Sequence, residues 1–499
     1  MKTDRIAAIV IYFLCFLAIL FFCLVAVNRF LYPYEVHWLE GSLLDQVARI
    51  QNGSPLYCQP SIHYVPWLYE PGYYYITAFI TKITGLSFVT ARIPSLLSTL
   101  GIVGLLYAIT KKETSSTLLS TAAVGLYLAA YMKTENSMLH ARVDSLFVFL
   151  LFASVAILYY KRSNTGVIIG ALLLVSAYFT KQTAIVVTPA IILYFWKTNR
   201  WKQLLLFTGV TIGCIALGTL LLDYSYSGWF SYYTSTLPKL GKTKMLDWRY
   251  AITWFFLFGV YRCWSVTCIS LWLPLKRILS SATQNDASLY FGLFAVTTAA
   301  MAFLGVLNQG GGHNVYLPLA CGSAVSLPLT IGQIKKRQRS LGYGIICLQL
   351  IQLLTYPWST SWASVTRQDI ENQQHFYSYV LSLDGSVWIP FHGYSSRFTN
   401  QEQFADLNAL RDVLLVGDST SRKLEDEYRA FLNSKHVDHI LCDVHAEFPG
   451  YYLADSMRNL NKPWISLITD TTGKQLNCPW MYHFVPEQRK QLLLTESNQ

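Results

Sequence analysis

The sequence predicts a polytopic α-helical membrane protein with about eleven transmembrane helices, interfacial helices in the first outer loop and a small C-terminal α/β domain. Three observations lead to this fold class. Hydrophobic residues make up 53% of the chain and charged residues only 13%, against about 25% charged residues in an average soluble domain. The apolar residues fall in long blocks, and short basic clusters separate these blocks. The two parts of the chain also differ in charge. Residues 1–357 contain 27 Lys and Arg and 11 Asp and Glu, whereas residues 358–499 contain 12 Lys and Arg and 17 Asp and Glu.

The first apolar block, Ile6 to Val27, has 22 residues without a charge. This length is enough to cross the roughly 30 Å of hydrocarbon in a bilayer. It is too long for a signal peptide, and no A-x-A-like cleavage site follows it. We therefore interpret it as the first of the predicted spans, which are 6–27, 93–110, 117–133, 145–160, 166–180, 183–197, 203–223, 250–275, 288–306, 315–334 and 341–357.

Basic clusters recur after every second span and indicate the orientation. On that side of the membrane the loops and the N-terminus carry 15 basic residues against three acidic ones. The positive-inside rule places such a face in the cytoplasm. The basic excess therefore reflects topology and anionic lipid, and it predicts no nucleic-acid partner. With eleven spans, residues 1–357 form the membrane domain and residues 358–499 a soluble domain on the outer side.

The opposite, outer face collects most carboxylates of the membrane part. Ionisable groups at membrane level are costly and tend to mark function, so we expect any chemistry on this face. The longest outer loop, 28–92, carries an amphipathic segment at 40–51 and an aromatic segment at 67–85. Both segments are typical of helices that lie in the membrane interface.

Two short apolar runs occupy residues 166–198, and Thr180-Lys181-Gln182 separates them. Each run reaches only about 22 Å as a helix. A single long span would place Lys181 at mid-membrane and would invert every later basic cluster. The sequence therefore predicts a hairpin with Lys181 at its apex near the outer surface.

The C-terminal part has the pattern of a mixed α/β domain. Residues 387–389, 413–416 and 439–442 are short apolar runs that predict buried strands, and residues 424–434 have helical spacing. No glycine-rich phosphate loop, nucleophile elbow or metal-binding cluster occurs there.

Four segments, and a fifth stretch that is similar to a later family element, carry a resemblance to a known family. They are the stretches 38–45 with 52–57, 69–75 with 91–95, 141–144, 170–189 and 314–318. In their order and topology they resemble the GT-C superfamily of membrane glycosyltransferases, and particularly the bacterial family 39-like branch of protein O-mannosyltransferases and aminoarabinose transferases. Two positions depart from that pattern: Leu39-Glu40 stands where an Asp-Glu pair is usual, and Glu70 and Gly72 flank the single Pro71.

The resemblance implies an enzyme that moves a sugar from a polyprenyl-phosphate donor to an acceptor on the outer face. The acceptor would be a glycan, a lipid or a protein, and membrane lipids would surround the chain. We expect a bacterial inner membrane, with a cytoplasmic N-terminus and a periplasmic C-terminal domain. The alternatives are a polytopic transporter and a non-catalytic envelope-assembly protein. No internal repeat is evident, which disfavours a transporter.

Such a transfer needs a carboxylate that accepts the acceptor's proton. Glu40 falls at the family's acidic motif and is the first candidate, although a carboxylate at a helix start is also stabilised by the helix dipole. Glu35 is the second candidate. Asp144, at the outer end of the fourth span, could orient the acceptor or simply pair with Arg142.

The departing phosphate needs cations. Lys181 is the main candidate because a lysine at a membrane hairpin apex requires a partner, either a lipid phosphate or a protein carboxylate. Arg92 and Arg142 are secondary candidates, since an interfacial arginine can instead reach toward lipid headgroups.

The substrate groove is predicted from polar and aromatic residues of the outer loops. These residues are Tyr69, Glu70, Tyr73, His313 and Asn314. Aromatic residues at this level also form interfacial belts, and a lone outer-loop histidine is often plain polar surface. No spacing requires a cofactor or a metal site, and a divalent ion held between carboxylates and phosphate stays an open alternative.

Overall fold

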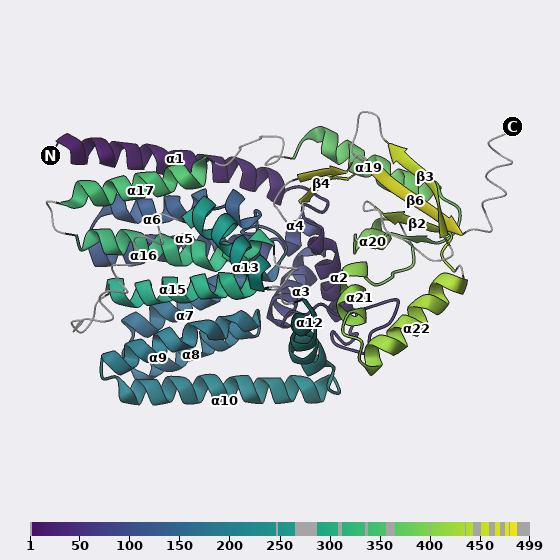
Figure 1. The fold of residues 1–499 in the computed structure, drawn as a ribbon, viewed down its shortest axis with the longest axis horizontal. Coiled ribbons are helices and arrows are strands. Elements are labelled where there is room, and N and C mark those ends of the chain that lie inside the picture. The colour runs from purple at the N-terminus through teal and green to yellow at the C-terminus, as the bar shows by residue number, and fades with distance from the viewer. Residues whose placement is uncertain are drawn as a thin grey trace.

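A computed structural model provides the structure of the chain. It describes residues 2–245, 248–264, 287–307, 312–334, 338–355, 365–399, 401–434 and 436–442, together with the backbone of four strands between 451 and 486. Helices run along the long axis of the molecule, and the N-terminus lies at the far end from the C-terminal sheet (Figure 1). The first outer loop lies between these two parts.

Long apolar helices form the bundle. Their bounds are α1 (Lys2–Phe30), α5 (Ile93–Thr114), α6 (Thr117–Ala129), α7 (Val143–Tyr160), α8 (Asn164–Tyr178), α9 (Thr188–Lys197), α10 (Trp201–Ser225), α15 (Ala287–Val306), α16 (Leu317–Gly332) and α17 (Arg339–Leu354). Short helical turns precede three of them: α4 (Phe88–Ala91), η2 (Gln182–Val187) and η5 (His313–Tyr316).

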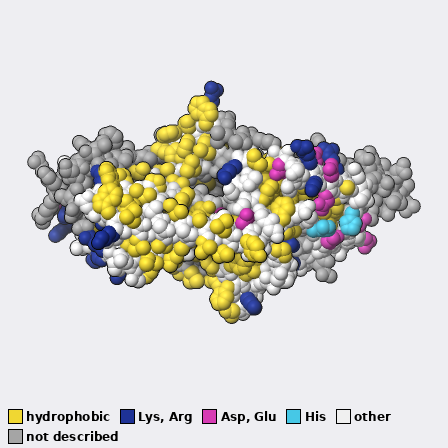
Figure 2. All heavy atoms as spheres, turned by 90° about the horizontal axis from the view of Figure 1, so that it is seen from below, with side chains coloured by type: hydrophobic (Ala, Val, Ile, Leu, Met, Phe, Trp, Pro, Cys, Tyr) yellow, Lys and Arg dark blue, Asp and Glu magenta, His cyan; other side chains and the backbone are white. Residues whose placement is uncertain are grey.

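Six helical segments of the described chain are long and apolar enough to cross a membrane, and four shorter apolar helices accompany them. These ten segments coincide with ten of the predicted spans. The remaining predicted span, 250–275, begins with α13 (Trp248–Trp254) and η4 (Phe255–Trp264), and its later residues lie outside the described ones. Hydrophobic side chains cover the bundle surface, whereas charged side chains gather toward the two ends (Figure 2). The predicted fold class is confirmed.

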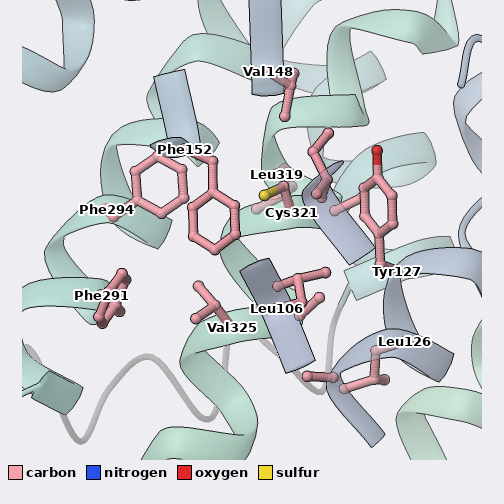
Figure 3. Packing of buried hydrophobic residues seen from close by; sticks show 14 of the residues in the cluster. Leu106, Leu126, Tyr127, Val148, Phe152, Phe291, Phe294, Leu319, Cys321 and Val325 are labelled. Carbon is pink, nitrogen blue, oxygen red and sulfur yellow. The ribbon is translucent and has the colours of Figure 1, made fainter. Parts of the chain in front are cut away.

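The interior of the bundle is a continuous apolar core. Tyr127 of α6 and Phe152 of α7 are fully buried in it, and the ring of Phe152 stacks on Phe294 of α15 with 5.6 Å between centroids. Figure 3 shows these side chains between helices that are distant in sequence. Such close packing fixes the relative positions of the helix ends, from which the outer loops project.

The outer loops contain short helices. They are α2 (Leu39–Gln51), α3 (Gly72–Thr84), η1 (Met132–Thr134), α11 (Trp229–Ser231), η3 (Tyr232–Thr236) and α12 (Leu237–Met245). The two helices predicted in the first outer loop are thus α2 and α3. Ten of the 13 residues of α2 are buried, because α2 packs between the bundle and the C-terminal part.

The C-terminal part combines helices with two small sheets. Its elements are α19 (Arg367–Ser382), β1 (Val387–Trp388), α20 (Ser395–Thr399), α21 (Leu407–Leu414), α22 (Ser419–Ser434), β2 (His439–Cys442), β3 (Tyr451–Arg458), β4 (Ile465–Thr469), β5 (Gln475–Cys478) and β6 (Trp480–Pro486). The larger sheet has the order β1-β2-β6-β3, with β1 parallel to β2 and the other pairs antiparallel.

One predicted strand is wrong. Residues 413–416 do not form a strand, because α21 extends through Leu414. Asp406 caps this helix by accepting hydrogen bonds from the backbone N–H groups of Asn408 and Ala409. Leu407, Leu410 and Val413 then share its buried face. The strands predicted at 387–389 and 439–442 and the helix predicted at 424–434 are confirmed as β1, β2 and α22.

The C-terminal part and the first outer loop share one hydrophobic core. Leu43 and Val47 of α2 lie in the same cluster as Leu410 and Ile440. The backbone of α2 approaches that of the C-terminal part so closely that a Cβ atom on Gly41 would lie 2.0 Å from the carbonyl oxygen of Gly393. The C-terminal part therefore packs directly on the predicted first outer loop.

Candidate active site

Lys181 lies at the apex of the predicted hairpin, between α8 and η2. Gly72, at the start of α3, packs against this turn and donates its N–H to the carbonyl of Phe179 at 2.7 Å. A Cβ atom on residue 72 would lie 2.7 Å from that carbonyl oxygen. Proline at this position would have neither the N–H nor the space, which explains the departure from the family pattern.

The ammonium of Lys181 contacts a carboxylate of the protein. Its Nζ lies 2.7 Å from Oδ1 of Asp144, and Asn314 Nδ2 donates to the same oxygen at 3.1 Å. Oδ2 of Asp144 lies 3.3 Å from Nε of Arg142 and accepts no hydrogen bond from the described residues. Four of the predicted site residues therefore meet at one point.

Arg142 extends this cluster toward the first outer loop. Its Nη1 lies 3.8 Å from Oε2 of Glu135 and 3.0 Å from Nε2 of His37. Tyr69 lies beside the same guanidinium. Arg142 thus joins the second outer segment of the chain, 135–144, to two parts of the first.

Glu40 is completely enclosed. Arg92 donates from Nε to Oε1 at 3.0 Å and from Nη2 to Oε2 at 2.6 Å, while the backbone N–H groups of Ala141 and Val36 donate at 2.7 and 3.0 Å. Burial alone would raise the pKa of Glu40, but the guanidinium and the four hydrogen bonds outweigh it and lower this pKa. Glu40 is therefore charged and fully hydrogen-bonded in this structure.

Arg92 has no N–H group to spare. Besides Glu40, it donates to the carbonyl oxygens of Arg29, Tyr32 and Tyr34, at 3.1, 2.6 and 2.6 Å. These carbonyls belong to the segment that leads from α1 into the first outer loop. The Glu40–Arg92 pair thus organises that segment.

Arg29 was not among the residues selected from the sequence, although it is a fully buried cation at the outer end of α1. Its Nη2 donates to the carbonyl of Val36 at 3.1 Å and lies 3.5 Å from His140. Its Nε and Nη1 have no hydrogen-bond partner among the described residues. An arginine at the end of an apolar span was the available signal, but the sequence gives the same signal for arginines that reach into headgroups.

Two buried histidines also belong to this cluster and were missed. His37 lies between Arg142 and Glu135, and His140 lies 5.0 Å from it, measured between ring centroids. Burial lowers the pKa of both, and neighbouring arginines lower it further. Both rings are therefore neutral at physiological pH.

Glu35 lies apart from Lys181 and Asp144, on the side that faces the C-terminal part. Its Oε2 lies 2.7 Å from Nδ1 of His392, and its Oε1 accepts the N–H of Gly41 at 3.0 Å. Burial raises the pKa of Glu35 to about 7, although the contact with His392 opposes this. Asp45, four residues after Gly41 in α2, is also buried, and it accepts the N–H of Tyr394. Burial raises the pKa of Asp45 to about 7.

The groove residues predicted from the first outer loop are mostly buried. The hydroxyl of Tyr73 donates to the carbonyl of Ala91 at 2.9 Å, which ties α3 to the segment before Arg92. Glu70 has one carboxylate oxygen without a partner among the described residues, and burial raises its pKa to about 8. Glu70 is therefore protonated at neutral pH. His313 does not contact Asp144 as Asn314 does, and its ring packs edge-on against Trp254.

The contacts above join buried charges into one layer at the outer end of the bundle, which we call the outer ionic layer. Its members are the cations Arg29, Arg92, Arg142 and Lys181 and the carboxylates Glu40, Glu135 and Asp144. Four cations thus face three carboxylates. Lys181 is the most accessible member, with 16% of its side chain exposed. No group of three metal-ligating side chains is found among the described residues.

Comparison with protein families gives a match to a glycosyltransferase family. The model of glycosyltransferase family 87 matches residues 67–307, which are 241 of the 499 residues. This match includes Arg92, Arg142, Asp144 and Lys181, and it confirms the predicted resemblance to membrane glycosyltransferases. No curated protein matches the sequence.

Several solved structures resemble the chain at low identity. ArnT from Cupriavidus metallidurans in the apo state has 12% identity and a TM-score of 0.42, with 85% of this chain and 92% of that one covered. The same protein bound to undecaprenyl phosphate has 11% identity and a TM-score of 0.42, with 95% of this chain and 97% of that one covered. The Archaeoglobus fulgidus oligosaccharyltransferase, crystallised in complex with Zn and sulfate, has 11% identity and a TM-score of 0.48. The match covers 87% of this chain and 68% of that one. All three TM-scores are below 0.5, so these likenesses do not extend to function.

Proposed function

We propose that this membrane glycosyltransferase takes a sugar from a polyprenyl-phosphate-linked donor and transfers it to an acceptor on the outer face of the membrane. The observation that carries this proposal is the excess of cations in the outer ionic layer. Buried charges are strongly destabilising unless they are compensated. An uncompensated cation at the outer end of apolar helices favours an anionic group that arrives from the membrane, and a lipid phosphate is such a group.

Lys181 is the residue best placed to meet the donor phosphate. It is the least buried cation of the layer, and a lysine side chain is flexible enough to turn from Asp144 toward a ligand. Arg142 lies on the other side of Asp144 and would stabilise the same phosphate as it departs. Arg92, whose N–H groups are all in use, would support the site by holding the loop instead of binding substrate.

Asp144 is the carboxylate that we assign as the general base. It lies between the two phosphate-binding candidates, and its Oδ2 accepts no hydrogen bond from the described part of the chain. When Lys181 turns toward a phosphate, Asp144 loses one of its cations, and its affinity for a proton rises. Glu40, the first candidate from the sequence, would have to give up four hydrogen bonds before it could accept a proton.

The proposal includes the orientation predicted from the basic clusters. The N-terminus would face the cytoplasm, and the C-terminal part would lie in the periplasm of a bacterial inner membrane. Labelling of single introduced cysteines with a membrane-impermeant reagent in intact cells would test this topology. Labelling in the C-terminal part, without labelling in the loop after α5, is the expected result.

Transfer itself is tested with purified protein in lipid nanodiscs and a panel of radiolabelled polyprenyl-phosphate sugars. Asp144→Asn removes the proposed base and keeps the shape of the side chain, and we expect at least a hundredfold loss of turnover. Asp426→Asn, in the exposed face of α22, is the matched control and should retain activity. If no donor is consumed by the wild-type protein, or if Asp144→Asn turns over normally, the mechanism proposed here is wrong.

A further inference from the structure

A second polar site lies at the other end of α2, outside the outer ionic layer. It is a pocket of about 240 Å³ between the end of α2, the loop that follows and the C-terminal part. One water occupies roughly 30 Å³ in the liquid, so this pocket has room for a group as large as one sugar ring. Arg49 and Arg397 line it from opposite sides of the interface, together with the polar residues Asn52, Ser54, Ser61 and Gln403.

Arg49 is held in place as a binding group. Its Nε donates to the carbonyl of Pro55 at 2.7 Å, and its guanidinium stacks on the ring of Tyr64 at 4.0 Å from the centroid. Tyr64 is fixed in turn, since its hydroxyl oxygen lies 2.8 Å from both Oε1 of Gln46 and the carbonyl oxygen of Leu56. Nη2 of Arg49 also donates to Sγ of Cys58 at 3.5 Å. A guanidinium that is stacked and anchored in this way keeps its remaining donors in a defined orientation.

Arg397 approaches the pocket from α20 of the C-terminal part. Its side chain is exposed and lies 5.5 Å from the ring centroid of Tyr394. Neither Arg49 nor Arg397 forms an ion pair within 4.0 Å with any carboxylate of the described chain. The carboxylate of Glu402 lies 3.5 Å from His63, which lines the pocket, and 3.3 Å from His436.

We propose that this pocket binds an anionic sugar of the acceptor, recognised by its phosphate or carboxylate group. Two arginines match the planar, bidentate geometry of these groups. The amides and hydroxyls around them match the hydroxyls of a sugar ring, and such neutral polar groups would be unnecessary for a bare anion. The inference rests on the proposed function, because it assigns the acceptor of that reaction.

The position of the pocket agrees with this assignment. Arg49 follows Glu40 by nine residues on the same helix, which corresponds to about 14 Å along the helix axis. The pocket is therefore separated from the outer ionic layer by the length of a short oligosaccharide. An acceptor anchored in the pocket by its anionic sugar would present a sugar several units further along its chain to Asp144 and Lys181.

Binding can be measured without any donor, by ligand-observed NMR titration of the full chain in phosphatidylcholine nanodiscs. The probes are glucose 6-phosphate, glucuronate, glucose and inorganic phosphate. We expect at least one anionic sugar to bind tenfold more tightly than glucose and than inorganic phosphate. The probe that binds, phosphate ester or carboxylate, then identifies the anionic group.

Arg397→Gln is the main variant, because its side chain is exposed and its loss should leave the fold intact. We expect it to weaken binding of the anionic sugar at least tenfold. Arg422→Gln, an exposed arginine of α22 outside the pocket, is the matched control and should change the affinity less than twofold. Arg49→Gln should have the same effect as Arg397→Gln, provided that its melting temperature matches that of the wild type.

Three outcomes would overturn the inference. Anionic sugars could bind no better than glucose, Arg397→Gln could leave their affinity unchanged, or inorganic phosphate could bind as well as the sugar phosphate. The last result would leave a simple anion site without sugar recognition. These results are independent of donor consumption, so a failure of the pocket and a failure of the proposed transfer can be told apart.

Discussion

The enclosed pair of Glu40 and Arg92 leads to a quantitative prediction. In Glu40→Gln, the side-chain oxygen can still accept two of the four hydrogen bonds, but the new NH₂ group faces two donors, Nη2 of Arg92 and the N–H of Val36. Arg92 also becomes a buried cation without its carboxylate. Removing one partner of a buried ion pair typically costs about 3–5 kcal/mol, so we expect a marked loss of stability before any loss of chemistry.

The assay is thermal unfolding in nanodiscs, followed by tryptophan fluorescence. A matched control exists, because Arg429 and Glu425 form an ion pair with the same N–O distance of 2.6 Å on the exposed face of α22. Exposed helical pairs contribute only about 0.3–0.5 kcal/mol, so Glu425→Gln should hardly change the melting temperature. Because the N–O distance is the same in both ion pairs, the comparison of the two melting temperatures reports the effect of burial.

A double variant separates the structural role from a catalytic one. Glu40→Gln combined with Arg92→Met removes both charges, and it should recover part of the stability because no lone buried cation remains. The reasoning is refuted if Glu40→Gln melts like the wild type and yet transfers no sugar. Glu40 would then be the general base, as its sequence position suggests, and Asp144 would be an orienting residue.

Three further variants test the neighbouring assignments. Lys181→Met should weaken donor binding at least tenfold in a labelled-donor assay, whereas Lys82→Met, an exposed lysine of α3, should not; equal affinities would leave Lys181 with only its structural pair. Glu70 has a folded-state pKa of about 8 against an ordinary value of 4.5, so the folded chain binds the extra proton and stability should fall as pH rises between these values. Glu70→Gln should remove that dependence and stabilise the protein at pH 9 by a few kcal/mol, at about 1.4 kcal/mol per pKa unit, and an unchanged pH profile of the melting temperature would contradict this. Tyr73→Phe should cost about 1 kcal/mol for the lost hydrogen bond to Ala91 without changing KM for the donor, and a raised KM would place Tyr73 in the groove instead.

The positions of the apolar helices were predictable because their signals are local. The hairpin around Lys181 followed from the length of two apolar runs and from the alternation of basic clusters. Both quantities depend only on residues close in sequence, and helices in a bilayer must satisfy their own backbone hydrogen bonds. The structure confirms both short helices, α8 and α9, with Lys181 between them.

The partners within the site were not predictable, because they come from distant segments. Arg92 is 52 residues from Glu40, and Lys181 is 37 residues from Asp144. Hydropathy places each residue at the outer face but contains no information on which opposite charge it meets there. For Lys181 the sequence left two partners open, a lipid phosphate and a protein carboxylate, and the structure without ligand contains the carboxylate.

The strand predicted at 413–416 failed for a related reason. Val413 to Val416 is a short apolar run, and such a run fits a buried strand as well as the end of an amphipathic helix. The deciding residue is Asp406, whose side chain caps the helix seven residues earlier. A capping residue so far from an apolar run is easily overlooked when the run is considered alone.

The two halves of the pocket are also distant in sequence, and α2 explains how they cooperate. Near its first turn, Glu40 binds Arg92 of the bundle; in its middle, Ser42 and Asp45 bind Asp406 and the backbone of Tyr394 in the C-terminal part. A helix held by buried contacts to both parts behaves as a rigid spacer. Movement of the C-terminal part would therefore shift the pocket and the outer ionic layer together, and the distance between an anchored acceptor sugar and the donor phosphate would be set by one helix.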